Sequence, residues 1–219
     1  GEMTAIIGST GSGKSTLINL IPRFYDVTSG SVKVNGQDVR EVKQTSLRDR
    51  IGYIPQKALL FSGTIESNLK YAKEDATQEE LDKAIEIAQA KNIIQEKAGH
   101  YEEPISQGGT NVSGGQKQRL SIARALVKNP DIYIYDDSFS ALDYKTDAAL
   151  RAALEKDLSD KTLIVVAQRI STIMNADQII VLNDGQVVGK GTHDELMDNC
   201  EVYREIAFSQ LSKEELNHE

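Results

Sequence analysis

The sequence has little cysteine, no long apolar run and no excess of positive charge. Cys200 is the only cysteine among the 219 residues, which excludes a disulfide framework and a thiolate metal cluster and favours an intracellular compartment. The sequence has 25 Lys and Arg residues and 33 Asp and Glu residues, which gives a formal net charge of −8. A surface that binds nucleic acid by neutralising its phosphates is therefore not expected. No apolar stretch approaches the roughly 18 residues that cross a bilayer, so a membrane role requires another segment or a partner.

A glycine-rich loop follows the apolar run at residues 4–7. Residues 8–16 read GSTGSGKST and satisfy G-x-x-x-x-G-K-[ST], the pattern of a loop whose backbone N–H groups surround a polyphosphate. Lys14 supplies a charge to the outer phosphates, and the Ser15 hydroxyl is placed to ligate Mg²⁺. The expected strand before the loop and apolar helix after it are the context that this motif requires. The predicted nucleotide-binding residues are Ser9, Thr10, Gly11, Ser12, Gly13, Lys14, Ser15 and Thr16.

Two carboxylates end the apolar strand that is expected over residues 131–137. In an open α/β sheet, ligands bind at the carboxyl ends of the strands, so both point to the phosphate site. Asp136 is placed to hold Mg²⁺ through its water shell, and Asp137 to orient an attacking water. Two structural alternatives remain: Asp136 can cap the next turn, and the short side chain of Asp137 can fall short of the water.

A second anion site is predicted at residues 113–116, where a helix begins that ends at Asn129-Pro130. Ser113 and Gln116 form a capping box, and the two glycines between them leave the helix N-terminus bare. An ordinary capped helix explains the same residues equally well. The helical spacing from Thr77 to Gly99 adds to this pattern, so residues 57–128 are expected to form a largely helical insert between sheet elements.

The remaining patterns predict alternating strands and helices. Asn35-Gly36 and Asp184-Gly185 are hairpin turns, residues 50–56 and 161–167 are short strands, and residues 146–158 form a helix. Two short helices are expected after residue 193. The sequence shows no internal repeat and no low-complexity tract.

In this order the motifs resemble those of the nucleotide-binding domain of ATP-binding cassette (ABC) transporters, over essentially the whole chain. The resemblance rests on the phosphate loop, Gln56, Ser113-Gly114-Gly115-Gln116, Asp136 and Ser140-Ala141-Leu142-Asp143. It implies an α/β fold of the P-loop NTPase type, with a mixed central sheet and the helical subdomain at 57–128 inside one domain, 1–219. It also implies ATP and Mg²⁺ as cofactors and an ATPase activity.

In that family two domains pack head to tail, and each ATP lies between the phosphate loop of one and the signature of the other. The resemblance therefore implies that residues 113–116, here called the signature, bind the γ-phosphate of ATP held by a partner. It places residues 140–143, the D-loop, at the contact between the two domains. Gln56, Asp137 and Gln168 are the implied catalytic residues, and the implied metal ligands are Ser15, Gln56 and Asp136.

Two segments are similar to the exporter branch of the family. Residues 60–69, LFSGTIESNL, resemble the segment that meets a transmembrane domain, so 57–71 is the expected contact with that domain. Residues 105–109, ISQGG, resemble the exporter cross-linking loop with Gln107 in place of the usual acid. The chain would then be an N-terminally truncated piece of a longer transporter, at the cytoplasmic face of the cell membrane.

Two departures from the family lie at the chemistry. The family has glutamate where this chain has Asp137, and histidine where it has Gln168. Losing a methylene withdraws the carboxylate by about 1.5 Å, and a misplacement on the order of 1 Å can cost about a hundredfold in rate. Two departures beside an intact signature resemble the degenerate half of a heterodimeric multidrug exporter, which binds ATP, hydrolyses it weakly and completes the site of a different chain.

Two other classes remain as alternatives. A soluble ABC ATPase without a transporter acts in chromosome structure, repair or translation. The chromosome type carries a very long coiled coil between phosphate loop and signature, whereas about a hundred residues without heptads separate Lys14 from Ser113 here. An importer ATPase is the other alternative, and it would be a separate polypeptide with its own N-terminal strands.

Overall fold

The computed structural model describes residues 1–216, with side chains through residue 210. Its centre is a six-stranded sheet in the order β10 (Gln186–Gly191), β9 (Gln178–Asn183), β1 (Met3–Gly8), β8 (Thr162–Val166), β7 (Ile132–Asp136) and β4 (Ile51–Ile54). All neighbours pair in parallel except β10, which pairs with β9 antiparallel. The predicted α/β architecture with a mixed central sheet is confirmed.

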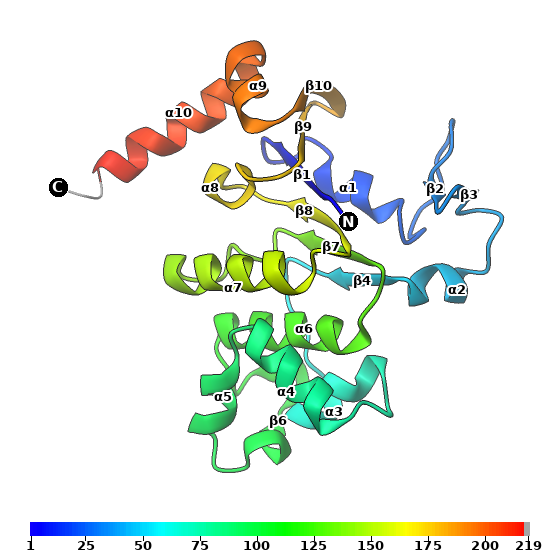
Figure 1. Ribbon diagram of the computed structural model, residues 1–219, viewed down its shortest axis with the longest axis vertical. Helices are drawn as coiled ribbons and strands as arrows, with labels where there is room; N and C mark the ends of the chain where they lie inside the picture. The colour runs from blue at the N-terminus through cyan, green and yellow to red at the C-terminus, as the bar shows by residue number, and fades with distance from the viewer. Residues whose placement is uncertain (217–219) are drawn as a thin grey trace.

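The sheet is buried on both faces because its strands alternate apolar side chains between two cores. In β1, Ala5 and Ile7 join the larger core and Ile6 joins the smaller one. The smaller core includes side chains of α1 (Lys14–Asn19) and α2 (Gln44–Asp49). The larger core lies toward the long helices α6 (Gly114–Lys128) and α7 (Tyr144–Asp157), which run below the sheet in Figure 1.

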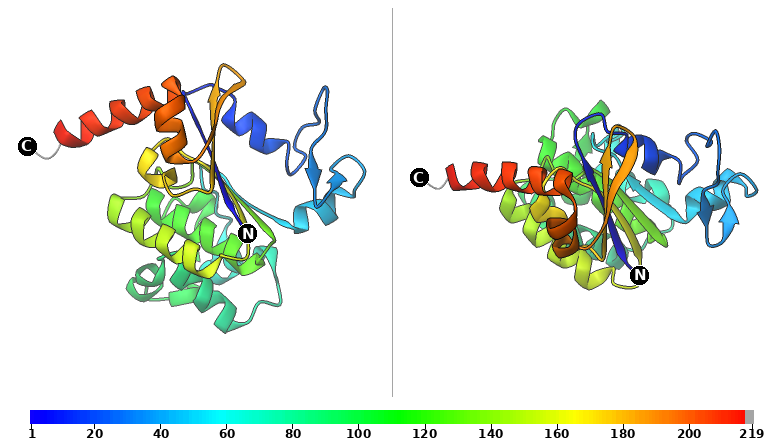
Figure 2. Two further views of the ribbon diagram at one scale, coloured as in Figure 1. Left: turned by 45° about the horizontal axis from the view of Figure 1, so that its top comes forward. Right: turned by 90° about the horizontal axis from the view of Figure 1, so that it is seen from above.

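Residues 57–128 hold most of the short helices, and they lie together on the α6 side of the sheet (Figures 1 and 2). Besides α6 they comprise β5 (Gly63–Thr64), α3 (Ile65–Leu69), η1 (Lys70–Ala72), α4 (Gln78–Ile87), α5 (Lys91–Glu96), η2 (His100–Glu102), β6 (Pro104–Ile105) and η3 (Gln107–Gly109). The expected single helical stretch from Thr77 to Gly99 is two helices, because Gln89 adopts a left-handed φ of 55° between them.

The capping and turn patterns have the expected local structure. Thr77 and Glu80 form the reciprocal capping box of α4. Asn35-Gly36 connects β2 (Lys33–Val34) to β3 (Gln37–Asp38), with φ of 51° and 79°, which are the angles of a tight hairpin turn. Asp184-Gly185 does the same between β9 and β10, with φ of 48° and 76°.

The C-terminal part adds three helices beside the sheet. They are α8 (Ile170–Ile173), α9 (His193–Asn199) and α10 (Glu201–Leu216), and α10 projects away from the domain in all three views (Figures 1 and 2). The tail therefore contains the two expected helices, of which the second is longer than expected. Within the described part of the chain, none of the helices has the length and apolar character that crossing a membrane requires.

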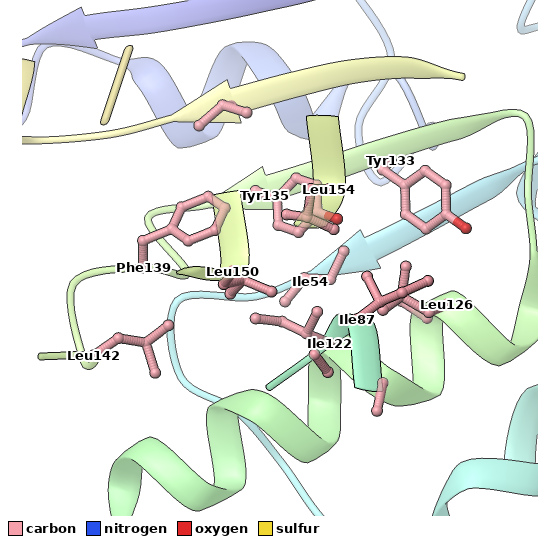
Figure 3. Close-up of a cluster of buried hydrophobic side chains, with 14 of the residues drawn as sticks. Ile54, Ile87, Ile122, Leu126, Tyr133, Tyr135, Phe139, Leu142, Leu150 and Leu154 are labelled. Atoms are coloured by element: carbon pink, nitrogen blue, oxygen red, sulfur yellow. The ribbon is translucent and has the colours of Figure 1, made fainter. Parts of the chain in front are cut away.

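Part of the larger core lies between α6 and the strands β4 and β7. Figure 3 shows Ile122 of α6 beside Ile54 of β4, with Tyr135 of β7 and Leu150 of α7 nearby. All four side chains have relative exposures of 0%. Packing here fixes the helical segment against the strands that carry the polar residues described next.

Replacing Ile122 with alanine is expected to lower the free energy of unfolding by about 2–5 kcal/mol, because it leaves a cavity in this core. Urea unfolding measures the change. The matched control is Val187→Ala on β10, since Val187 is 59% exposed and the same measurement should move by less than about 0.5 kcal/mol. Equal effects of the two variants would contradict the packing described here.

Candidate functional site

Polar residues lie at the carboxyl ends of four parallel strands, which form one edge of the sheet. β1 ends at Gly8 and β7 at Asp136, while Gln56 and Gln168 each lie two residues beyond the ends of β4 and β8. The carboxyl ends of parallel strands meet at the same edge, where open α/β sheets bind ligands. The strand pairing thus brings together residues that are up to 160 positions apart.

The phosphate loop connects β1 to α1 by a path that requires glycine. A Cβ on Gly8 would lie 2.2 Å from the backbone oxygen of Leu182 in β9, so any side chain there would push the two strands apart. Gly13, directly before α1, has a left-handed φ of 95°, which side chains disfavour. The N–H of Gly185 donates a hydrogen bond to the backbone oxygen of Ser12 in this loop, at 3.1 Å.

Lys14 reaches back over this loop. Its Nζ donates to the backbone oxygens of Gly8 at 2.8 Å and Ser9 at 2.7 Å. Burial lowers the pKa of Lys14, and the nearby carboxylates of Asp137 and Asp136 oppose that shift by raising it. A lysine charge, a glycine-rich loop and two carboxylates therefore occupy one small region.

Both carboxylate oxygens of Asp136 accept hydrogen bonds from hydroxyl groups. Ser15 Oγ donates to Oδ1 at 3.0 Å, and the Tyr53 hydroxyl donates to Oδ2 at 2.9 Å. Burial raises the pKa of Tyr53, and the charge of Asp136 raises it further, so this hydroxyl keeps its proton. The carboxylate of Asp136 is thus bound by hydroxyls of α1 and β4 rather than by the backbone of the next turn.

The residues around Asp136 fit a magnesium ion. Mg²⁺ is held by oxygen ligands, uses one or two carboxylates, and completes its shell with water and phosphate oxygens. The Ser15 hydroxyl and the Asp136 carboxylate supply two such oxygens side by side, next to the loop that would carry the phosphates. Among the side chains that the structure describes, through residue 210, no group of three or more His, Cys, Asp or Glu residues could hold a metal ion by itself.

Asp137 is bound by two side-chain amides. Gln56 Nε2 donates to Oδ2 at 2.8 Å, and Gln168 Nε2 donates to the same oxygen at 2.6 Å. Burial raises the pKa of Asp137, whereas the hydrogen bonds from Gln56 and Gln168 lower it, and the net shift is upward. Because a carboxamide neither takes up nor releases a proton at ordinary pH, Asp137 is the titratable group of this trio.

The signature lies at the N-terminus of α6. The N–H of Gln116 donates to Ser113 Oγ at 3.2 Å, and the N–H of Ser113 donates to Gln116 Oε1 at 3.0 Å. The predicted capping box is thus present, while Ser113 and Gly114 remain exposed. The capping box does not use the N–H groups of Gly114 and Gly115. The N-terminus of α6 is therefore capped and yet keeps backbone N–H groups that the cap does not bind.

The D-loop connects the signature to Asp137. A Cβ on Gly115 would lie 3.5 Å from the backbone oxygen of Ala141, so α6 begins directly beside this loop. Ser140 Oγ donates to the backbone oxygen of Asp137 at 2.8 Å, and Asp143 caps α7 by accepting from the N–H of Thr146 at 2.9 Å. Leu142 is buried, which anchors the loop.

Sequence reasoning missed three residues at this edge. Tyr53 contacts Asp136 and also Asn19, whose Oδ1 lies 3.0 Å from the tyrosine oxygen. Gln210 of α10 accepts from the N–H of Ile170 at 2.8 Å and donates to the backbone oxygen of Gln168 at 2.6 Å. Each contact joins residues at least 34 positions apart, so no local pattern marks them.

A hollow with aromatic walls lies beside residues 57–71. The rings of Phe61 and Tyr71 stack with centroids 4.5 Å apart, and the guanidinium of Arg124 lies 5.4 Å from the Phe61 centroid. Phe24 and Tyr53 also line this hollow. Tyr71 is 66% exposed, so the surface offers aromatic side chains to solvent.

The ABC transporter family profile matches residues 1–140. The chain is 49% identical over 213 residues to an uncharacterized ABC transporter ATP-binding protein of Mycobacterium tuberculosis, covering 96% of this chain and 36% of that protein. It is 45% identical over 206 residues to a putative multidrug export ATP-binding/permease protein of Bacillus subtilis, covering 94% of this chain and 36% of that protein.

Vertebrate and structural relatives extend this similarity. The chain is 43% identical over 215 residues to ATP-binding cassette sub-family B member 6 of Xenopus tropicalis, covering 98% of this chain and 25% of that protein. The structure of a bacterial Atm1-family ABC exporter with ATP bound superposes with a TM-score of 0.93 at 37% identity, covering 96% of this chain and 37% of that chain. The chain thus spans a quarter to somewhat over a third of the length of these proteins.

The contacts of Asp137 predict how it titrates. By NMR of ¹³C-labelled aspartate, its carboxyl should titrate above the ordinary value of 3.8. Replacing Gln56 with leucine should raise the pKa further, because it removes a hydrogen bond that favours the carboxylate. Between pH 3.8 and the folded-state pKa the folded chain binds more protons at this group, so the stability it contributes is lost as pH rises through that pKa.

Gln78→Leu is the control for this titration. Gln78 is exposed and donates to Asp82 at 2.9 Å, so its loss should leave the Asp137 titration unchanged. An unchanged or lower pKa of Asp137 in the Gln56→Leu variant would contradict the geometry described here.

Proposed function

The chain belongs to the ABC transporter family as an ATP-binding domain of exporter type, and we propose that it drives substrate export while its own ATP site hydrolyses ATP slowly. In this proposal it pairs with a second, different ATP-binding domain and completes that partner's active site. The chain spans 36% of relatives whose names include an export ATP-binding/permease protein. That similarity favours export over the soluble ABC ATPase and importer alternatives.

MgATP occupies the edge of the sheet in this proposal. The backbone and hydroxyls of residues 9–16 hold the phosphates, Lys14 neutralises their charge, and Ser15, Asp136 and Gln56 hold Mg²⁺. Mg²⁺ held by these residues would offset the negative charge of the phosphates. The pairing of Ser15 with Asp136 at 3.0 Å supports this assignment.

The contact of both glutamine amides with one oxygen of Asp137 carries the proposal of slow hydrolysis. A carboxylate orients an attacking water by accepting its hydrogen bond, and here Gln56 and Gln168 already donate to Oδ2. Gln168 cannot transfer a proton as histidine can. Three features of Asp137 therefore favour slow hydrolysis. Its side chain is short, its Oδ2 already accepts two hydrogen bonds, and neither of the two glutamines that bind it can transfer a proton.

The signature serves the partner's nucleotide in this proposal. Ser113 and Gly114 are exposed at the N-terminus of the 15-residue helix α6, where backbone N–H groups and the helix dipole favour an anion. The D-loop, residues 140–143, adjoins Gly115. The two segments thus form one surface against which the second domain packs head to tail.

The aromatic hollow beside residues 57–71 is the proposed contact with the transmembrane domain. The stacked rings of Phe61 and Tyr71, with Arg124 over Phe61, offer apolar contact area and a charge to a docked helix. In this arrangement residues 57–128 act as the helical subdomain of one ATP-binding domain, 1–219, at the cytoplasmic face of the membrane. No nucleic acid takes part.

Restoring the family's residues should raise hydrolysis at this chain's own site. In the full-length protein assembled with its partner chain, Asp137→Glu with Gln168→His should speed turnover at this site by about a hundredfold, because the carboxylate advances by a methylene and a proton-transferring side chain returns. Trapping of nucleotide at each site measures the two rates separately. Equal hydrolysis at both sites of the wild-type pair would overturn the proposal of a slow site.

The signature and the phosphate loop should act on different ATP molecules. Ser113→Glu places a negative charge against the γ-phosphate and should lower turnover of the assembled pair by about a hundredfold, with ATP binding by this chain unchanged. Lys14→Ala should abolish ATP binding by this chain and leave the partner's hydrolysis detectable.

Ser46→Glu, on the exposed surface of α2, is the matched control and should change neither property. If Ser113→Glu and Lys14→Ala impaired the same ATP site, the shared-site arrangement would be wrong.

A further inference from the structure

A three-residue chain of polar side chains leads from α1 to the metal carboxylate. The hydroxyl of Tyr53, on β4, lies 2.9 Å from Oδ2 of Asp136 and 3.0 Å from Oδ1 of Asn19. Asn19 is the last residue of α1, and Asp136 is the last residue of β7. One hydroxyl thus connects α1, β4 and β7.

The Tyr53 hydroxyl uses its single proton to donate a hydrogen bond to Asp136. An ionised carboxylate only accepts hydrogen bonds, and a phenol has a single proton to donate. A second donor is then needed for the contact with Asn19, and a half-turn of the Asn19 amide presents its NH₂ group to the tyrosine oxygen. The chain of donors runs from Asn19 to Tyr53 to Asp136.

Asp136 is held from both sides. Ser15 Oγ binds Oδ1 at 3.0 Å while Tyr53 binds Oδ2, so the plane of the carboxylate is fixed by two hydroxyls from different elements. Removing either hydroxyl frees the carboxylate to rotate about its Cβ–Cγ bond. Only Ser15 belongs to the phosphate-binding pattern, and Tyr53 has no role in it.

The ring of Tyr53 is itself anchored. Its edge meets the ring of Phe24 at a centroid distance of 5.5 Å and an interplanar angle of 69°, which is a favourable arrangement. The Arg48 guanidinium lies 5.3 Å from the Phe24 centroid and donates from Nε to the backbone oxygen of Pro22 at 3.1 Å. The hydroxyl is therefore presented to Asp136 from a fixed position.

We propose that Tyr53 is a positioning residue that holds Asp136 in the orientation required to bind Mg²⁺ with the nucleotide. The proposal rests on the proposed function, which assigns Asp136 to the metal. Hydrogen-bonding partners of metal ligands fix ligand orientation, and their loss lowers metal affinity by about tenfold or more. Tyr53 acts on the metal through Asp136 and does not touch the nucleotide.

The test compares ATP binding with and without metal. The full chain is titrated with a fluorescent ATP analogue in excess EDTA and again in excess Mg²⁺, and the ratio of the two affinities measures the metal's contribution. Tyr53→Phe keeps the ring and removes the hydroxyl. It should lower this ratio by about tenfold while the affinity in EDTA and the melting temperature stay near those of the wild type.

Two further variants separate the possible outcomes. Tyr133→Phe is the matched control, because within the described residues the buried Tyr133 hydroxyl has no hydrogen-bond partner, and its ratio should equal that of the wild type. Asp136→Asn removes the proposed metal ligand and should bring the ratio close to one. If Asp136→Asn leaves the ratio unchanged, the proposed metal site itself is wrong.

If Asp136→Asn lowers the ratio and Tyr53→Phe does not, the inference about Tyr53 alone is overturned. It is equally overturned if Tyr53→Phe weakens binding to the same extent in EDTA, since that would indicate a structural role. Asn19→Leu completes the test: it should lower the ratio in the wild type and have no further effect in the Tyr53→Phe background, because the amide acts through the hydroxyl.

Discussion

The parallel pairing of β1, β8, β7 and β4 determines where the polar residues of the site meet. It aligns the carboxyl ends of four strands, so the phosphate loop, Gln56, Asp136 and Gln168 meet although they are far apart in sequence. On its other side β1 pairs with β9, and Gly8 permits the close approach of β1 to Leu182 of that strand. A shift in register would separate the hydroxyl–carboxylate pair of Ser15 and Asp136, because the two residues stand on different elements.

What could be predicted from the sequence follows from the range of each interaction. The turns at Asn35 and Asp184 and the caps at Thr77 and Ser113 depend on neighbouring residues, and their patterns predicted them correctly. The α/β class with a mixed sheet was implied by the resemblance to the ABC transporter family, and the structure confirms it. The phosphate loop and its flanking elements were expected together, and β1 and α1 have the expected places.

Contacts between distant segments could not be predicted in this way. Gln210 donates a hydrogen bond to the backbone oxygen of Gln168, 42 positions away, and Tyr53 donates one to Asp136, 83 positions away. No spacing rule relates such residues. The break between α4 and α5 was also missed, because the apolar spacing continues through it while Gln89 turns the backbone. The roles of Asp137 and Gln168 in hydrolysis stay predictions, since geometry fixes their contact and rates must be measured.

Tyr53 and Gln56 provide two separate hydrogen bonds between the region of β4 and the carboxylates at the end of β7. Gln56 follows β4 and binds Asp137, whereas Tyr53 lies within β4 and binds Asp136. The two carboxylates are thus held by side chains only three positions apart, one within the edge strand β4 and one just after its end. The ring of Tyr53 also lines the aromatic hollow that includes Phe24 and Phe61. Any movement of β4 is therefore expected to act on both carboxylates at once. Tyr53 itself lines the hollow and also binds Asp136.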